Sequence, residues 1–322
     1  MHEAAQRLRP KAEQRSGCDD DDCRALARGL EEMSPMINYT LPDFTVNLGL
    51  NLFFVRLLRE RPEMAREGVA VTSLYGCFPG CVMNGGRTYL RERTSPAAME
   101  RTFAIMAEYG LAPRLTFTNS LVSEETLADP YFNDICRIAA RFGGEAIVYD
   151  DAAGAYLREN YGMPLVLSTT REVADAATFN DLARSFDWIV LSYNVHKDPA
   201  VLGALAAPGK AEIMVNEFCV PGCPHRAEHY RHNSADQQDG VLRPFPCKSG
   251  RPDFFDHAPN HPVQFTAEEV ADTSARFGIS AFKIVGRGVA FATVVEALTY
   301  YLIRPECHEE ARALLAREMR RQ

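Results

Sequence analysis

Short apolar segments alternate with longer amphipathic segments from Met36 onward, and this alternation constrains the fold more than any other feature of the sequence. The apolar segments have the length of buried strands, and the amphipathic segments have the spacing of helices that pack on one face. The predicted strands are residues 37–41, 69–74, 114–118, 146–149, 165–168, 188–191, 212–215 and 281–285. The predicted helices between and after them are residues 48–59, 96–109, 131–142, 152–160, 171–185, 199–205, 267–277 and 289–302.

Eight strand–helix units in strict alternation predict an α/β fold, a closed (β/α)8 TIM-like barrel. An open doubly wound sheet is the alternative, but the early loops contain no G-x-G-x-x-G turn of the kind that binds dinucleotides in such sheets. We therefore predict one barrel domain over residues 36–305. A polar extension at residues 1–35 precedes the barrel, and a C-terminal helix at residues 306–322 follows it.

Composition limits the classes of partner that the protein can have. A chain of 322 residues with 46% hydrophobic content can bury one large core, and its net charge of −8 offers no basic surface for nucleic acid. No apolar run approaches the about 18 residues of a membrane helix, and the charged start of the chain lacks the hydrophobic segment of a secretory signal. We expect a cytoplasmic protein with no membrane or nucleic-acid partner.

The nine cysteines direct attention to metal chemistry. Their odd number, in a chain with no evident export signal, argues for reduced thiols rather than a disulfide framework. Cys18 and Cys23 flank a run of four aspartates, and we interpret that segment as a solvated surface extension rather than as a metal site.

Polar side chains follow every predicted strand, where the loops of a parallel barrel line its active face. Asp150, Asp151 and Thr170 are expected to cap the next helix, because such residues accept hydrogen bonds from free backbone N–H groups. Residues that directly follow a strand are candidates for a pocket. The candidates for substrate binding are Asn119, Tyr193, Asn194 and Asn216, and those for catalysis include Glu217 and Arg287.

The loop at residues 75–87 is rich in glycine, which lets a backbone approach a ligand closely. Arg87 at its end could hold a carboxylate or phosphate through two hydrogen bonds. The loop is not a P-loop, because it lacks the G-K-[ST] ending. Such loops also exist merely to turn the chain, so anion binding is one of two interpretations here.

A cysteine-rich insertion at residues 216–262 is the longest in the barrel, and long insertions in compact domains are usually functional or disordered. Cys219, Cys223 and Cys247 could converge on one metal, with Cys81 or Cys77 of the glycine-rich loop as the fourth ligand. Zinc and an iron–sulfur cluster both fit four thiolates. His229 in the same insertion could act as a general base.

Three elements of this chain resemble the family long catalogued as U32 peptidases. They are the Cys219–Cys247 loop after the seventh strand, the Cys81 loop after the second, and the run G-I-S-A-F-K-I-V-G-R at residues 278–287, which is similar to the family's K-I-x-G-R segment. Several members are oxygen-independent hydroxylation enzymes of ubiquinone biosynthesis and RNA modification. The resemblance implies a barrel over residues 36–305 and a [4Fe–4S] cluster held by Cys81, Cys219, Cys223 and Cys247.

The expected function is therefore an iron–sulfur-dependent oxidoreductase that hydroxylates or otherwise modifies a small acidic molecule, with an electron donor or partner subunit. His229, Glu217 and Arg287 are its catalytic candidates, and Arg87 is an anchor for the acidic group. A zinc-dependent hydrolase and a non-catalytic metabolite-binding barrel with a structural metal clip are the alternatives. The sequence leaves open whether Lys283, within the last strand, points into or out of the barrel.

Overall fold

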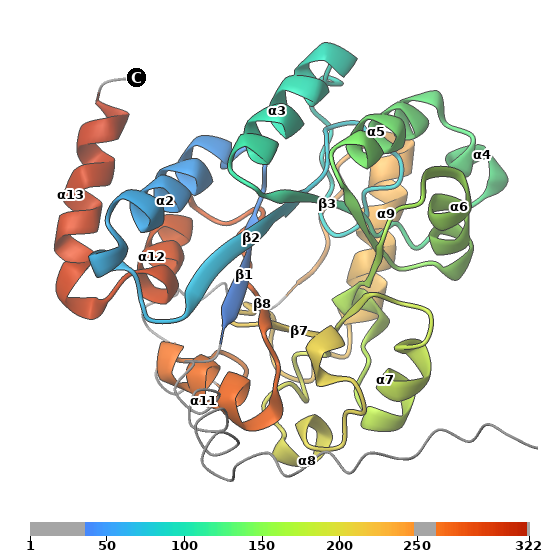
Figure 1. Ribbon diagram of the computed structural model, residues 1–322. Helices are drawn as coiled ribbons and strands as arrows, with labels where there is room; N and C mark the ends of the chain where they lie inside the picture. Colours follow the sequence, from blue (N-terminus) through green and yellow to red (C-terminus); the bar gives the residue numbers. More distant parts are fainter. Residues whose placement is uncertain (1–35, 248–261, 321–322) are drawn as a thin grey trace, which may run out of the picture. The chain divides into compact units, whose positions relative to one another are not determined.

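The computed structural model of the protein describes residues 36–247 and 262–320. Within these residues, eight parallel strands form a closed barrel in sequence order (Figure 1). Pairing of β1 with β8, through Asn38 with Ala281 and Thr40 with Lys283, closes the barrel. The predicted (β/α)8 barrel is confirmed. The strands are β1 (Ile37–Pro42), β2 (Val69–Gly76), β3 (Ala112–Phe117), β4 (Glu145–Val148), β5 (Leu165–Leu167), β6 (Trp188–Val190), β7 (Ala211–Met214) and β8 (Ala281–Lys283).

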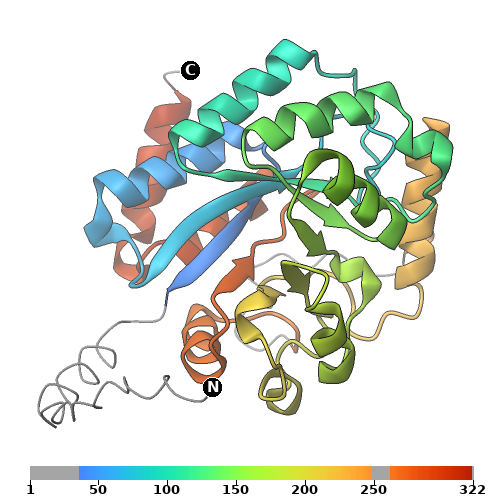
Figure 2. The same cartoon turned by 45° about the vertical axis from the view of Figure 1, so that its right-hand side comes forward.

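Helices surround the barrel on the outside (Figures 1 and 2). Asp150 caps α6 by accepting a hydrogen bond from the Ala153 N–H at 3.0 Å, as its position after β4 predicted. The helices that follow successive strands are α2 (Leu48–Glu60), α3 (Pro96–Glu108), α5 (Pro130–Arg141), α6 (Asp151–Tyr161), α7 (Ala176–Leu182), α8 (Pro199–Leu202), α11 (Ala267–Phe277) and α12 (Phe291–Leu302). A short helix, α4 (Glu124–Leu127), precedes α5.

The main apolar core lies between the barrel and these helices. Alternate strand residues point outward into it, and Tyr39 of β1 and Phe282 of β8 are fully buried there. The Tyr39 ring lies 6.2 Å from the Phe282 ring and 6.0 Å from the Tyr301 ring of α12, tilted against both. The apolar periodicity of the sequence arises because alternate strand residues point outward into this core.

The other face of the strands holds an unusual barrel interior, in which charged groups meet. Arg114 on β3 pairs with Glu212 on β7, and these strands are not neighbours in the sheet, so the contact crosses the interior. Arg114 also pairs with Glu145, and Glu212 accepts a hydrogen bond from Thr40 at 2.9 Å. The amine of Lys283 lies 3.7 Å from the second oxygen of Glu212. We call Arg114, Glu145, Glu212 and Lys283 the interior ion network.

A 14-residue helix, α9 (Arg226–Asp239), lies inside the cysteine-rich insertion, where the sequence analysis expected only a loop. Its sequence has no apolar stripe, and its buried side chains are polar, so hydrophobic periodicity could not reveal it. Ser234 donates to its own helix and accepts hydrogen bonds from Ser120, while Gln237 accepts from the Tyr89 N–H at 2.6 Å. These bonds hold α9 against the loops that follow β2 and β3.

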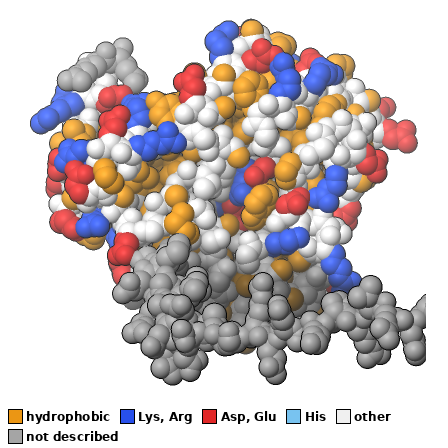
Figure 3. Space-filling model, in the orientation of Figure 1, with side chains coloured by type: hydrophobic (Ala, Val, Ile, Leu, Met, Phe, Trp, Pro, Cys, Tyr) orange, Lys and Arg blue, Asp and Glu red, His pale blue; other side chains and the backbone are white. Residues whose placement is uncertain are grey.

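A terminal helix, α13 (His308–Met319), packs through buried Ala311 and Leu315 close to the predicted position of a C-terminal helix. The predicted extension at residues 1–35, with Cys18 and Cys23, lies outside the described residues. None of the helices in the described part of the chain is both long and apolar enough to cross a membrane. On the face drawn in Figure 3, acidic and basic side chains are interspersed rather than gathered by sign.

Substitution of Arg114 by methionine is expected to destabilise the protein by about 3–5 kcal/mol, because Glu212 and Glu145 would keep buried charges without their shared partner. Urea unfolding at neutral pH measures this change. Arg276→Met is the control, since Arg276 forms an exposed pair with Asp272 and its loss should change stability by under about 0.5 kcal/mol. Equal effects of the two substitutions would contradict the role given to the network.

Candidate functional site

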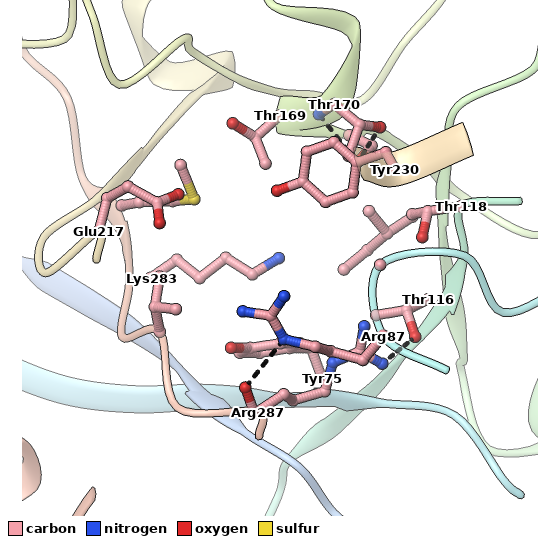
Figure 4. Close-up of a pocket in the computed structure, with 15 residues that line it drawn as sticks. Tyr75, Arg87, Thr116, Thr118, Thr169, Thr170, Glu217, Tyr230, Lys283 and Arg287 are labelled. Atoms are coloured by element: carbon pink, nitrogen blue, oxygen red, sulfur yellow. Dashed lines mark hydrogen bonds between the residues drawn. The ribbon is translucent and has the colours of Figure 1, made fainter. Parts of the chain in front are cut away.

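A pocket opens at the carboxyl ends of the strands, the face on which barrel enzymes carry their active sites (Figure 4). Its volume is about 90 Å³, which suits a ligand of few non-hydrogen atoms. We call it the inner pocket. Its lining residues are Tyr75, Gly86, Arg87, Thr116, Thr118, Ile147, Ser168, Thr169, Thr170, Met214, Glu217, Tyr230, Lys283, Val285 and Arg287.

Arg287 lies at the wall of the inner pocket in a fixed position. Its Nη1 donates to Thr116 Oγ1 at 2.7 Å and to Asn84 Oδ1 at 3.1 Å. A Cβ atom at Gly86 would lie 2.8 Å from the other terminal nitrogen, so the absence of a side chain there makes room for the guanidinium. Arg287 thus lines the inner pocket, and its catalytic role stays a prediction.

Arg87 reaches the same pocket from the glycine-rich loop. Its Nε donates to the Arg287 carbonyl oxygen at 3.3 Å, and Figure 4 shows its guanidinium beside the amine of Lys283. Gly85 of this loop does not approach a ligand: a Cβ there would lie 2.2 Å from the Thr118 carbonyl oxygen. The glycine instead lets the loop pack on the end of β3, which brings Arg87 inward.

Lys283 supplies a buried amine at the centre of the pocket (Figure 4). Its side chain leaves β8 on the interior face, its amine lies 4.3 Å from the centre of the Tyr75 ring, and the residue is 7% exposed. Burial lowers the pKa of Lys283 to about 8, against the attraction of Glu212 and with the repulsion of Arg114 and Arg287. The amine is therefore able to take up and release protons near neutral pH.

Glu217 also lines the pocket, but its charge is already compensated. One carboxylate oxygen accepts from the N–H groups of Phe218 at 2.8 Å and Cys219 at 3.0 Å, and the other lies 3.1 Å from an Arg226 nitrogen. Burial alone would raise the pKa of Glu217, but Arg226 and these N–H groups hold it below its usual value. The residue stays ionised and anchors the start of the cysteine-rich insertion.

Two threonine hydroxyls in the pocket have no hydrogen-bond partner among the described residues. Thr118 Oγ1 and Thr169 Oγ1 are both inaccessible to solvent and unpaired. Because neither oxygen has surface that solvent can reach, neither hydroxyl is open to a ligand in the pocket with the side chains placed as they are. Both residues line the inner pocket, as Thr170 does.

A second cavity of about 530 Å³ adjoins the inner pocket and shares Arg87, Glu217 and Tyr230 with it. We call it the outer cavity. The His229 ring stacks on Phe245 there, with centroids 4.4 Å apart and planes 2° from parallel. His229 thus lines the outer cavity and is absent from the wall of the inner pocket. Three predicted metal ligands also line it: Cys219, Cys223 and Cys247.

The fourth predicted ligand, Cys81, does not lie with the other three. It is fully buried in the main apolar core beside Cys77, whose pKa is raised by burial and by Cys81. Among residues 36–247 and 262–320, no three His, Cys, Asp or Glu side chains are grouped so that they could hold a metal ion. The four cysteines as placed here do not fit one cluster, so the iron–sulfur cluster and zinc stay predictions.

Two of the predicted substrate-binding asparagines have structural partners instead. Asn119 donates to the carbonyl oxygens of Val82 at 2.7 Å and Ser234 at 3.2 Å. Asn216 exchanges two hydrogen bonds with the backbone of Val285, at 2.6 and 2.9 Å. Neither lines the inner pocket or the outer cavity. An amide that directly follows a strand is thus used to tie neighbouring loops together.

Asn194 and Tyr193 hold the cysteine-rich insertion in place. Asn194 Oδ1 accepts from the Gly222 N–H at 2.8 Å, and the Tyr193 hydroxyl donates to the Val220 carbonyl oxygen at 2.8 Å. The guanidinium of Arg226 lies 4.3 Å from the centre of the Tyr193 ring. Both residues lie outside the lining of the two cavities and support the segment that carries Glu217.

Of the sequence candidates, Arg87, Arg287 and Glu217 meet in the inner pocket. Thr118 was not among the sequence candidates, and the direction of Lys283 was left open. Lys283 had a usable signal, because its apolar neighbours Phe282 and Ile284 are expected to point to the main core and so turn the lysine inward.

The chain is similar to several solved structures. A U32 peptidase, Mk0906, is 15% identical with a TM-score of 0.49, over 79% of this chain and 94% of that one. The spore cortex-lytic enzyme SleL of Bacillus cereus is 13% identical with a TM-score of 0.40, over 83% and 74% of the two chains. The 3-keto-D-glucoside 4-epimerase YcjR of E. coli is 13% identical with a TM-score of 0.29, over 83% and 98%.

No protein-family model and no curated protein matches the sequence. The fold assignment rests on the closed barrel described above.

The buried amine predicts a specific dependence of stability on pH. The pKa of Lys283 is about 8 in the folded protein and 10.5 in the unfolded chain, so between these values only the unfolded chain binds the proton. The unfolding free energy of the wild type, relative to that of Lys283→Met, should rise by on the order of 3 kcal/mol as pH increases through this window. Urea unfolding of both proteins measures it, and parallel pH profiles would exclude the shift.

Proposed function

We propose that this barrel is an enzyme that binds a small acidic molecule in the inner pocket and transfers protons through Lys283. The observation that carries the proposal is the charge of the pocket wall. Arg87, Arg287 and Lys283 face one small space. Glu212 balances Lys283 and Arg226 balances Glu217, whereas Arg87 and Arg287 form no ion pair with any carboxylate of the described residues. An anion is the ligand that balances this wall.

The two arginines and the small volume narrow the class of ligand. Arginine pairs through two hydrogen bonds with a carboxylate or a phosphate, as in a hydroxy acid, an oxo acid or a phosphate ester. The volume of about 90 Å³ limits the part that enters the inner pocket to a short group. Any larger remainder has room in the outer cavity, past Arg87 and Tyr230.

Lys283 supports a catalytic rather than a purely binding role. A general acid or base works best when its pKa lies near the working pH, and burial brings the pKa of this amine to about 8. A barrel that only bound an anion would gain more from a lysine that stays fully charged. Proton transfer to or from the bound acid is the reaction class that these groups support.

Loss of one arginine should weaken binding of the acid. Arg87→Gln is expected to reduce the affinity for pyruvate or inorganic phosphate about 10–100-fold, since a charge-assisted contact contributes about 1.5–3 kcal/mol. Isothermal titration calorimetry with each anion measures this. Arg184→Gln is the matched control: it removes the same charge from an exposed pair with Asp181. The proposal fails if neither anion binds the wild type, or if the two variants bind equally well.

A metal-dependent reaction, the oxygen-independent hydroxylation or the zinc-dependent hydrolysis, is the second candidate. What favours it is that Cys219, Cys223 and Cys247 line one cavity next to the inner pocket. Protein purified without oxygen should then contain iron with sulfide, or zinc, and Cys219→Ser should lose it. Cys307→Ser, in the partly buried turn before α13, should keep it. Metal-free wild-type protein would remove this candidate.

A further inference from the structure

We propose that Lys283 forms a covalent imine with a short 2-oxo acid whose carboxylate is held by Arg87 and Arg287. This inference rests on the proposed function and specifies its substrate class. Lysine amines that react with carbonyl compounds need a neutral nitrogen, a dry site and a means of holding the rest of the substrate. The inner pocket offers all three.

The amine of Lys283 is held loosely enough to react. Its distance of 3.7 Å to Glu212 Oε2 exceeds a hydrogen bond, and the face of the Tyr75 ring and the guanidinium of Arg87 are also close to it. Glu212 is committed to Arg114 and Thr40 through its other oxygen. With a pKa of about 8, roughly a quarter of the amines are neutral near pH 7.5, far more than for an exposed lysine.

The arginines place a carboxylate next to that amine. Figure 4 shows the Arg87 guanidinium beside the Lys283 amine, with Arg287 on the same wall. A carboxylate bound there carries its neighbouring carbon toward the amine, and in a 2-oxo acid this neighbour is the carbonyl carbon.

The reaction balances without any other reagent. The nitrogen lone pair adds to the carbonyl carbon, the C=O π electrons move to oxygen, and a proton passes from nitrogen to that oxygen to give a carbinolamine. Protonation of its hydroxyl releases water as the nitrogen lone pair forms the C=N bond. Amine and carbonyl compound thus give an iminium ion and water, with one proton supplied by the medium and no change of oxidation state.

Reductive trapping tests the inference. Wild-type protein is incubated with pyruvate or with dihydroxyacetone phosphate, then with sodium borohydride, and adducts are located by mass spectrometry of the intact chain and its peptides. We expect a pyruvate adduct at Lys283 and at least about a tenfold smaller yield with Arg87→Gln. An adduct with dihydroxyacetone phosphate instead would show that the arginines select phosphate, and would overturn the assignment of a 2-oxo acid.

Two lysine variants test whether the trapped adduct forms specifically at Lys283. Lys283→Arg keeps the charge but cannot form the imine, so trapping at this position should vanish. Lys210→Arg, at a lysine that donates to the backbone carbonyls of Ala183 and Phe186 on the outside of the barrel, should leave trapping unchanged. The other lysines of the chain are Lys11, Lys197 and Lys248, so the labelled peptide is readily identified.

The outcomes separate this inference from the proposed function. Arg87-dependent binding of pyruvate without an adduct at Lys283 would overturn the imine and leave acid binding intact. Adducts spread evenly over all lysines would also overturn it, because they would reflect general amine reactivity. If the wild type neither bound pyruvate or inorganic phosphate nor formed an adduct with pyruvate or dihydroxyacetone phosphate, both proposals would be overturned.

Discussion

The ion pair that Arg114 makes with Glu212 across the barrel is the interaction on which the rest of the structure depends. A barrel of eight short strands encloses a space that apolar side chains usually fill, but here the guanidinium of Arg114 on β3 pairs both with Glu145 on the neighbouring strand β4 and with Glu212 on the distant strand β7. Buried charges are tolerated only when they are paired and hydrogen-bonded. The pairing therefore links β3 and β7 through the interior, and it occupies one oxygen of Glu212.

The charged wall of the inner pocket, formed by Lys283, Arg87 and Arg287, depends on this interior ion network. Because Arg114 neutralises one side of Glu212, the second oxygen remains for Lys283 at a distance that gives attraction without a firm bond. The lysine stays buried, and its pKa falls to about 8 rather than rising in a tight pair. Arg87 and Arg287 complete the wall from loops that glycines allow to pack closely. The charges of Arg114 and Glu212 thus affect both the stability of the barrel and the pKa of Lys283.

The sequence predicted the fold well because strand alternation in a barrel is a local signal. All eight strands and most helices follow from apolar periodicity, and Arg87, Arg287 and Glu217 follow from their place after strands. The rest depends on contacts that periodicity does not encode. The α9 helix is held by polar side chains, Asn119 and Asn216 bind the backbone rather than a ligand, and Cys81 lies in the core although its loop reaches the active face.

Arg87, Glu217 and Tyr230 form a common wall between the inner pocket and the outer cavity. A compound in the inner pocket and a compound in the outer cavity would therefore contact the same three side chains. We expect the binding of one to change the affinity for the other. Thermodynamic linkage makes the effect reciprocal: whatever factor the outer occupant imposes on the inner affinity, the inner occupant imposes on the outer one. Because of this shared wall, the affinity measured for a ligand in the outer cavity is expected to depend on whether the inner pocket is occupied.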